Sequence, residues 1–170
     1  MTLATHAVVG GAVASLFPSH PLAAFFAGFF SHFVLDAIPH WDYKILSAYI
    51  NPFESGVSTK TKVDRYFVSD LFRTGTDLLI GISIVLIVWQ PATFAQLGIL
   101  ALGAVGGILP DFLQFVYARF RHQPMILIQK FHDFMHAKYE IDNSKLFVGI
   151  SLQLIFMACV VVLIKYLVKF

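Results

Sequence analysis

Three long apolar segments limit what this chain can fold into. They cover roughly residues 68–89, 93–118 and 146–168, and a helix needs about 20 residues to cross 30 Å of hydrocarbon. Two shorter apolar segments, 3–17 and 21–38, precede them and are separated by the turn sequence PSHP. Pro21 suits the first turn of the second helix, with Ser19 as its candidate cap. In hydrocarbon, backbone amides have to be bonded within their own segment, which favours helices. We therefore expect an all-α integral membrane bundle of about five spans, some of them short or half-embedded.

The composition agrees with a membrane protein. The chain is 58% hydrophobic and only 13% charged, whereas soluble domains have about 25% charged residues. Its 170 residues suit a single domain, 1–170. The net charge of +2 is too small to indicate nucleic-acid binding, so the expected partner is the lipid bilayer, and the oligomeric state stays open. The single Cys159 excludes a disulfide framework and a cysteine-based metal site, and we expect no cleaved signal peptide.

Basic residues predict the orientation of the bundle. Lysines and arginines gather in the two longer polar stretches, 39–67 and 119–145, while the turns PSHP and QPAT carry none. Five spans place both stretches on the side of the N-terminus, and the positive-inside rule makes that side cytoplasmic. We expect Lys165 and Lys169, at the other end of the last span, to reach the interface by snorkelling. The predicted location is a bacterial inner membrane.

Ionisable residues of the spans and of the adjoining loops converge on this cytoplasmic level. They are His6, His32, Asp36, His40, Asp42, Asp70, Asp77, Asp111, His132 and His136. Ionisable groups within a membrane are energetically costly and usually functional. The outer halves of the spans hold almost none apart from the two terminal lysines. This one-sided placement predicts a functional site at the cytoplasmic end.

The spacing of these residues predicts shared helix faces. His32 and Asp36 are four residues apart, so both side chains lie on one face of a helix. Pro39 ends that helix because the residue before a proline avoids the α conformation, and His40 can then fold back toward the pair. His132, His136 and Glu140 repeat the four-residue step, which predicts a second ligand-bearing helix.

Imidazoles and carboxylates on neighbouring helices are typical of a metal site in a helical bundle. The candidate ligands are His6, His32, Asp36, His40, Asp77, Asp111, His132 and His136. Such donors suit Zn²⁺ first, with Mn²⁺ and Fe²⁺ as alternatives, in one or two ions. Asp42 and Glu140 are the candidate general bases. Two structural alternatives stay open: Asp42 could cap a helix, and Asp111, after Pro110, could begin one.

Short motifs resemble known hydrolase families. HFVLDAIPHWD, and HAKYE with His136 and Glu140, resemble motifs of the zinc-dependent phospholipase C and single-strand nuclease superfamily. THAVVGG and GGILPD resemble the bacterial membrane-bound metal-dependent hydrolase family, which includes a LexA-regulated inner-membrane member. That family's His-Arg-Gly-x-Thr-His-Ser segment is absent, and FHDFMHAKYE stands in its place. The resemblance implies a helical, metal-dependent phosphoester hydrolase.

The expected function is therefore hydrolysis of a phosphoester, most simply a lipid or lipid-linked phosphate, with Arg119 and Arg121 attracting the phosphate. Two other classes stay open. A His-x-x-x-Asp helix pair also suits a divalent metal-ion transporter, although transport sites usually lie near the midplane. A metal-stapled membrane adaptor without turnover is the other alternative.

Overall fold

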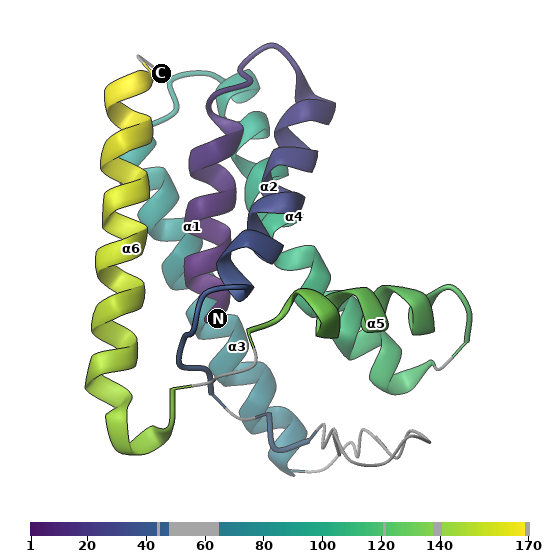
Figure 1. The fold of residues 1–170 in the computed structure, drawn as a ribbon. Helices are drawn as coiled ribbons and strands as arrows, with labels where there is room; N and C mark the ends of the chain where they lie inside the picture. The colour runs from purple at the N-terminus through teal and green to yellow at the C-terminus, as the bar shows by residue number, and fades with distance from the viewer. Residues whose placement is uncertain (44, 48–64, 121, 138–140, 169–170) are drawn as a thin grey trace.

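The computed structural model describes residues 1–43, 45–47, 65–120, 122–137 and 141–168, without the side chains of residues 65, 118 and 119. This part of the chain forms helices and connecting loops, with no strand (Figure 1). The elements are α1 (Leu3–Ala14), α2 (Pro21–Asp36), α3 (Arg65–Trp89), α4 (Phe94–Arg119), α5 (Met125–Met135), the short 3₁₀ turn η1 (Asn143–Lys145) and α6 (Leu146–Leu167). The all-α class predicted from the apolar segments is confirmed.

Helix α1 is the centre of the bundle. It packs against α2, α3, α4 and α6, and Figure 1 shows α6 on one side of it and α2 with α4 on the other. Most of its residues are buried, which explains why it is apolar on all sides. The two ends of the chain lie toward opposite ends of the bundle, and α5 lies across the direction of the long helices (Figure 1).

Within the described part of the chain, three helices are long and apolar enough to cross a membrane. These are α3, α4 and α6, with 25, 26 and 22 residues. Helices α1 and α2 have 12 and 16 residues, or about 18 and 24 Å at 1.5 Å per residue. They are therefore shorter than the hydrocarbon layer, as expected for the first two segments.

Glycines let α1 and α2 approach α4 closely. A Cβ on Gly10 or on Gly28 would overlap the carbonyl oxygen of Gly103, and a Cβ on Gly107 would overlap that of His6. The helix backbones are thus in direct contact, which is a common way of packing helices in membranes. This contact brings the first turns of α1 and the last turns of α2 against the second half of α4.

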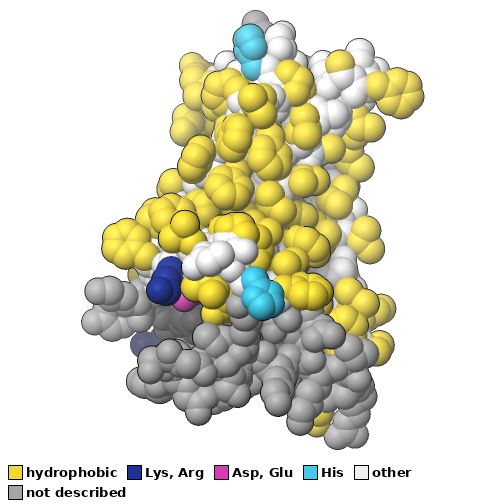
Figure 2. All heavy atoms as spheres, turned by 90° about the vertical axis from the view of Figure 1, so that its right-hand side faces the viewer, with side chains coloured by type: hydrophobic (Ala, Val, Ile, Leu, Met, Phe, Trp, Pro, Cys, Tyr) yellow, Lys and Arg dark blue, Asp and Glu magenta, His cyan; other side chains and the backbone are white. Residues whose placement is uncertain are grey.

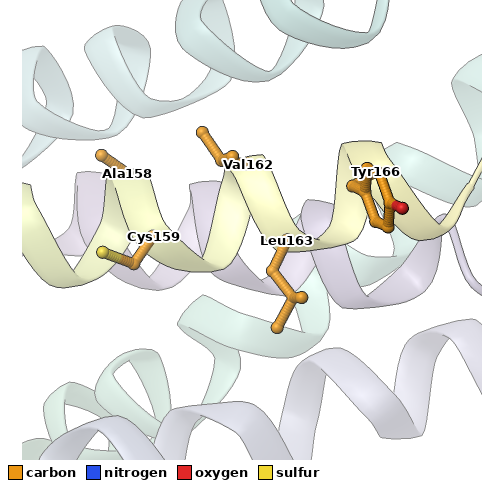
Figure 3. Close-up of a pocket in the computed structure, with 5 residues that line it drawn as sticks. All are labelled: Ala158, Cys159, Val162, Leu163 and Tyr166. Carbon is orange, nitrogen blue, oxygen red and sulfur yellow. The ribbon is translucent and has the colours of Figure 1, made fainter.

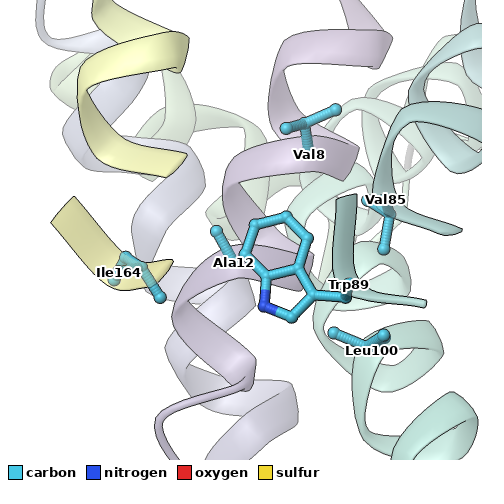
Figure 4. Packing of buried hydrophobic residues seen from close by; sticks show 6 residues of the cluster. All are labelled: Val8, Ala12, Val85, Trp89, Leu100 and Ile164. Atoms are coloured by element: carbon cyan, nitrogen blue, oxygen red, sulfur yellow. The ribbon is translucent and has the colours of Figure 1, made fainter. Parts of the chain in front are cut away.

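The far half of the bundle is filled by apolar side chains. Figure 4 shows this cluster, which consists of Val8, Ala12, Val85, Trp89, Leu100 and Ile164. Its members come from α1, α3, α4 and α6 and are almost fully buried. The cluster separates the polar end of the molecule from the opposite face.

The start of α2 differs in one detail from the sequence prediction. It begins at Pro21, as expected for a proline in the first turn, but the N-cap is His20, which makes no side-chain cap bond. Ser19 is therefore not the cap. The helix ends at Asp36, ahead of Pro39, so the predicted stop is confirmed.

Two further elements differ from expectation. Pro110 lies inside α4, so Asp111 does not begin a helix. The expected helix carrying both His132 and His136 ends earlier, at Met135, and His136 has an extended backbone with φ −68° and ψ 141°. His136 therefore follows the helix instead of sharing a face with His132.

Candidate metal centre

Asp36 lies at the centre of a buried group of imidazoles. His32 is one turn earlier on α2, and its Nε2 lies 3.0 Å from Asp36 Oδ2, as the four-residue spacing predicts. Helix α5 adds His132, whose Nε2 lies 3.4 Å from the same oxygen. All three side chains are almost fully buried. The Asp36 carboxylate is thus shielded from water, and two imidazole nitrogens lie close to one of its oxygens.

Asp111 adds a fourth donor from α4. Its Oδ1 lies 3.8 Å from Nε2 of both His32 and His132, and those two nitrogens are 3.0 Å apart. Donor atoms of these residues and Asp36 lie within 4.8 Å of one another. Ligands about 2.0 Å from a tetrahedral ion are about 3.3 Å apart, which lies within the observed range. The four residues therefore have the donor types and spacing of a four-coordinate site.

A second group shares Asp36. It consists of Asp36, His40 and His136, whose donor atoms also lie within 4.8 Å of one another. Here Asp36 uses its other side, with Oδ1 3.9 Å from His40 Nε2. The amino group of Met1 lies 3.1 Å from this Oδ1 and 2.7 Å from His40 Nε2. This side of Asp36 thus already accommodates a positive group.

Backbone hydrogen bonds bring His136 to this group although it has left the helix. The amide of Ala137 donates to the carbonyl oxygen of Asp36 at 2.7 Å, and the amide of Ile141 donates to that of His40 at 2.9 Å. The rings of His40 and His136 consequently lie with centroids 4.9 Å apart. The break after Met135 therefore allows this pairing with the end of α2.

Three of the histidines are oriented in the same way. In each, Nδ1 pairs with a backbone carbonyl oxygen: His32 with Gly107 at 2.8 Å, His40 with Ile38 at 2.7 Å and His136 with Ala137 at 3.2 Å. A carbonyl oxygen only accepts, so Nδ1 carries the hydrogen and donates it. In the neutral ring Nε2 then carries the lone pair, which is the usual arrangement of metal-binding histidines.

His6 is buried beside these groups without a well-directed hydrogen bond. Its ring stacks on that of His32 with centroids 4.0 Å apart, and its Nε2 lies 3.2 Å from Asp36 Oδ1 and 3.9 Å from Asp111 Oδ2. Among the described residues, neither ring nitrogen of His6 nor Asp36 Oδ2 has a hydrogen-bond partner. Buried polar atoms of this kind call for an explanation such as a bound ion. The residues present therefore fit a metal ion.

The structure places Asp77 outside this cluster. Its Oδ2 accepts from the amide of Ala4 and from the hydroxyl of Tyr43, both at 3.2 Å. A carboxylate in this position complements the positive end of α1. Asp77 thus ties the start of α1 to α3 and to the loop after α2.

Of the two candidate bases, only Asp42 lies in the described part of the chain. Glu140 lies outside the described residues, as does Arg121, and the side chain of Arg119 is not described. Asp42 lies at the edge of the cluster, with Oδ2 3.5 Å from the Met1 amino group and 37% of its side chain exposed. Its Oδ1 accepts from the amide of Tyr43 at 2.7 Å. Asp42 caps no described helix.

Burial shifts the pKa of both loop residues of the site. It lowers the pKa of His40 to about 4, so the imidazole is neutral near pH 7, the form that binds metals. Burial also raises the pKa of Asp42 to about 6, because a charged carboxylate is poorly solvated there. A carboxyl that titrates close to neutral pH suits a proton acceptor.

The sequence analysis missed Gln114. This half-buried residue lies on α4 one turn after Asp111, and its side-chain amide is 2.7–2.8 Å from the ring nitrogens of His132. It therefore orients His132, which comes from a different helix. The signal in the sequence was a polar residue three positions after Asp111 on an otherwise apolar helix.

A shallow depression elsewhere carries no such chemistry. It lies on α6 and is lined by Ala158, Cys159, Val162, Leu163 and Tyr166 (Figure 3). None of the metal-ligand residues lines it, and Cys159 is exposed there. The depression belongs to the apolar surface of α6, one of the helices long and apolar enough to cross a membrane.

Comparisons with known proteins yielded no relative. No family model, no curated protein and no solved structure matched the chain. The residues around Asp36 therefore carry the functional argument, and the resemblance of the short motifs to metal-dependent hydrolases stays a prediction.

Proposed function

We propose that this protein is a membrane-bound, metal-dependent hydrolase of a phosphoester. The observation that supports it most is the buried Asp36, faced by histidines whose Nδ1 atoms are bonded to backbone carbonyl oxygens. The resemblance of HFVLDAIPHWD and HAKYE to phosphodiester-cleaving zinc enzymes supports the choice of bond. The basic loops support a bacterial inner membrane with the site at its cytoplasmic face.

The metal centre holds two ions in this proposal, one on each side of Asp36, and the second ion takes the place of the Met1 amino group between Asp36 Oδ1 and His40 Nε2. Oδ2 of Asp36 serves the group formed with His32, Asp111 and His132, and Oδ1 serves the group with His40 and His136. His6 supplements them from α1. Nitrogen and carboxylate donors favour Zn²⁺, with Mn²⁺ or Fe²⁺ as alternatives.

The substrate is a lipid or lipid-linked phosphate, because the cluster lies at the end of apolar helices where headgroups are found. A divalent cation held there supplies Lewis-acid chemistry, which activates water and stabilises negative charge on phosphoryl oxygens. Asp111, with 27% of its side chain exposed, marks the open side of an otherwise buried cluster. Asp42, at the edge of the cluster beside Met1, would accept a proton from water.

The test compares metal content and hydrolysis in three proteins. The wild type and the variants Asp36→Asn and Asp133→Asn are purified, loaded with Zn²⁺ and assayed against phospholipid vesicles and a chromogenic phosphodiester. Asp133 is an exposed carboxylate on α5 that bonds Gln129, so its variant is the matched control. We expect Asp36→Asn to lose both the metal and the activity, and Asp133→Asn to keep both.

Two results would overturn the proposal in different ways. A wild type that binds no metal would remove the metal centre. A wild type that binds metal but cleaves no phosphoester would keep the centre and remove the hydrolase.

A further inference from the structure

Helix α5 has three distinct sides. Gln129 and His132 are buried, and His132 reaches the metal centre. On the outer surface, Leu127, Phe131 and Phe134 are 65%, 47% and 81% exposed, and their spacing of four and three residues aligns them along one edge. Lys130 and Asp133 are exposed on the other edge. The helix therefore presents a buried side, an apolar edge and a polar edge.

This apolar edge continues the surface of a membrane-embedded helix. Phe26, Phe30 and Val34 are exposed along one face of α2. Near its end, Phe33 packs edge-on against Phe131, with ring centroids 4.9 Å apart. Phe33 itself is buried, so this apolar contact joins α2 to α5 directly beneath their exposed faces.

The placement of α5 suits an interface and not a span. Its 11 residues cover about 16 Å, too little to cross a bilayer, and Figure 1 shows it lying across the long helices. Figure 2 views the side on which α5 projects: hydrophobic side chains cover most of the described surface, and charged side chains occur in its lower part. Amphipathic helices at this boundary lie in the membrane plane.

We infer that α5 is an in-plane membrane helix, whose edge of Leu127, Phe131 and Phe134 is immersed among lipid acyl chains and holds His132 against Asp36. The lipid leaflet next to the metal centre is then a structural part of that centre. Loss of the apolar edge frees the helix and weakens metal binding, although no ligand is changed. The inference rests on the spans and on the ligand cluster, and it does not depend on hydrolysis.

Spin labelling tests the immersion directly. In a Cys159→Ser background reconstituted into vesicles, nitroxides are placed singly at positions 127, 131 and 134, and at positions 130 and 133. We expect the first three to collide more with oxygen, which concentrates in lipid, and the other two with a water-soluble nickel chelate. A label at Leu163, exposed on span α6, gives the lipid reference. Water accessibility at the apolar edge would overturn the inference, and so would protection from both reagents, which would indicate a second copy or another protein.

Zinc binding tests the coupling. The double variant Leu127→Ser/Phe134→Ser is compared with Phe147→Ser/Val162→Ser, which alters exposed apolar residues of α6 away from the cluster. We expect about tenfold weaker Zn²⁺ affinity for the first variant in vesicles, by competition with a chelating dye, and no change for the second. His132→Ala removes the ligand that α5 contributes, so it gives the largest loss of Zn²⁺ affinity that freeing α5 could cause. Equal affinities of the two double variants would show that the leaflet does not hold His132, whatever the outcome for hydrolysis.

Discussion

Asp36 is the residue on which both groups of potential ligands depend. Its two oxygens face different imidazoles, with Oδ2 against His32 and His132 and Oδ1 toward His40. A lone charge in this position would be costly to bury. A cation beside Oδ2 offsets this charge, and a second cation beside Oδ1 would replace the Met1 amino group, which lies 3.1 Å from that oxygen.

The metal stoichiometry of single variants follows from this arrangement. We expect two ions per chain in the wild type, about one in His132→Ala or His40→Ala, and almost none in Asp36→Asn, because only Asp36 belongs to both groups. Elemental analysis after dialysis measures this, with the exposed His122→Ala as the control. If His132→Ala loses both ions together, the two groups do not bind independently.

Asp77 gives a contrasting prediction. Because its Oδ2 accepts from Ala4 and Tyr43, Asp77→Asn should keep the metal and lower stability by about 1 kcal/mol, through a weaker bond to the start of α1. Thermal unfolding in detergent and metal analysis read the two effects separately. Metal loss comparable to that of Asp36→Asn would instead make Asp77 a ligand.

At this scale the sequence predicted most of the cluster. His32 and Asp36 could be paired from their spacing, and the membrane level of His6 and Asp111 was enough to group them with that pair. Asp77 shares the same level, but depth alone does not say which way a side chain points around its helix. His136 was grouped with the ligands as well, but its position after the helix could not be foreseen, because it depends on long-range backbone bonds from Ala137 and Ile141.

At the scale of elements, close helix packing positions the ligands. Gly107 shows this best, because its carbonyl oxygen accepts from His32 Nδ1 at 2.8 Å while its Cα faces the backbone of His6. One residue thus sets both the distance between α1 and α4 and the orientation of a ligand. The site depends on this helix contact as much as on the ligands themselves.

A pair of glycine variants on α4 tests that dependence. Gly107→Ala would overlap the His6 carbonyl oxygen, whereas Gly98→Ala meets nothing within 4 Å. We expect Gly107→Ala to cost about 1–3 kcal/mol as an overpacked contact and to weaken Zn²⁺ binding. Gly98→Ala should be neutral or stabilise by up to about 1 kcal/mol. Normal Zn²⁺ affinity in a folded Gly107→Ala protein would show that the ligands tolerate displacement of α1.

Helix positions were predictable where an apolar run or a proline defined them. The start of α2 at Pro21, its end before Pro39 and the extents of α4 and α6 follow from such local signals. The end of α5 at Met135 has no such signal, because FHDFMHAKYE contains neither proline nor glycine. The chain after Met135 does not continue the helix, because Ala137 and Ile141 instead bond to the backbone at the end of α2.

For the whole molecule, the decisive feature is the difference between its two ends. The ligands gather at one end, and the cluster formed by Val8, Ala12, Val85, Trp89, Leu100 and Ile164 fills the bundle beyond them (Figure 4). Transport sites usually lie near the midplane and are opened to both sides by broken helices. Here α4 continues through Pro110 as a helix, and none of the six residues of that apolar cluster is ionisable.

A flux measurement therefore separates the hydrolase from a divalent metal-ion transporter. Vesicles containing the wild type or Asp36→Asn enclose a Zn²⁺-sensitive dye, and Zn²⁺ is added outside. We expect neither protein to carry Zn²⁺ faster than protein-free vesicles do, because a cation bound at Asp36 meets a dry, tightly packed cluster on its way across. The wild type should still bind Zn²⁺ in the same preparation. If it carries Zn²⁺ and Asp36→Asn does not, the ligand cluster is the mouth of a pathway, and the apolar cluster must open during transport.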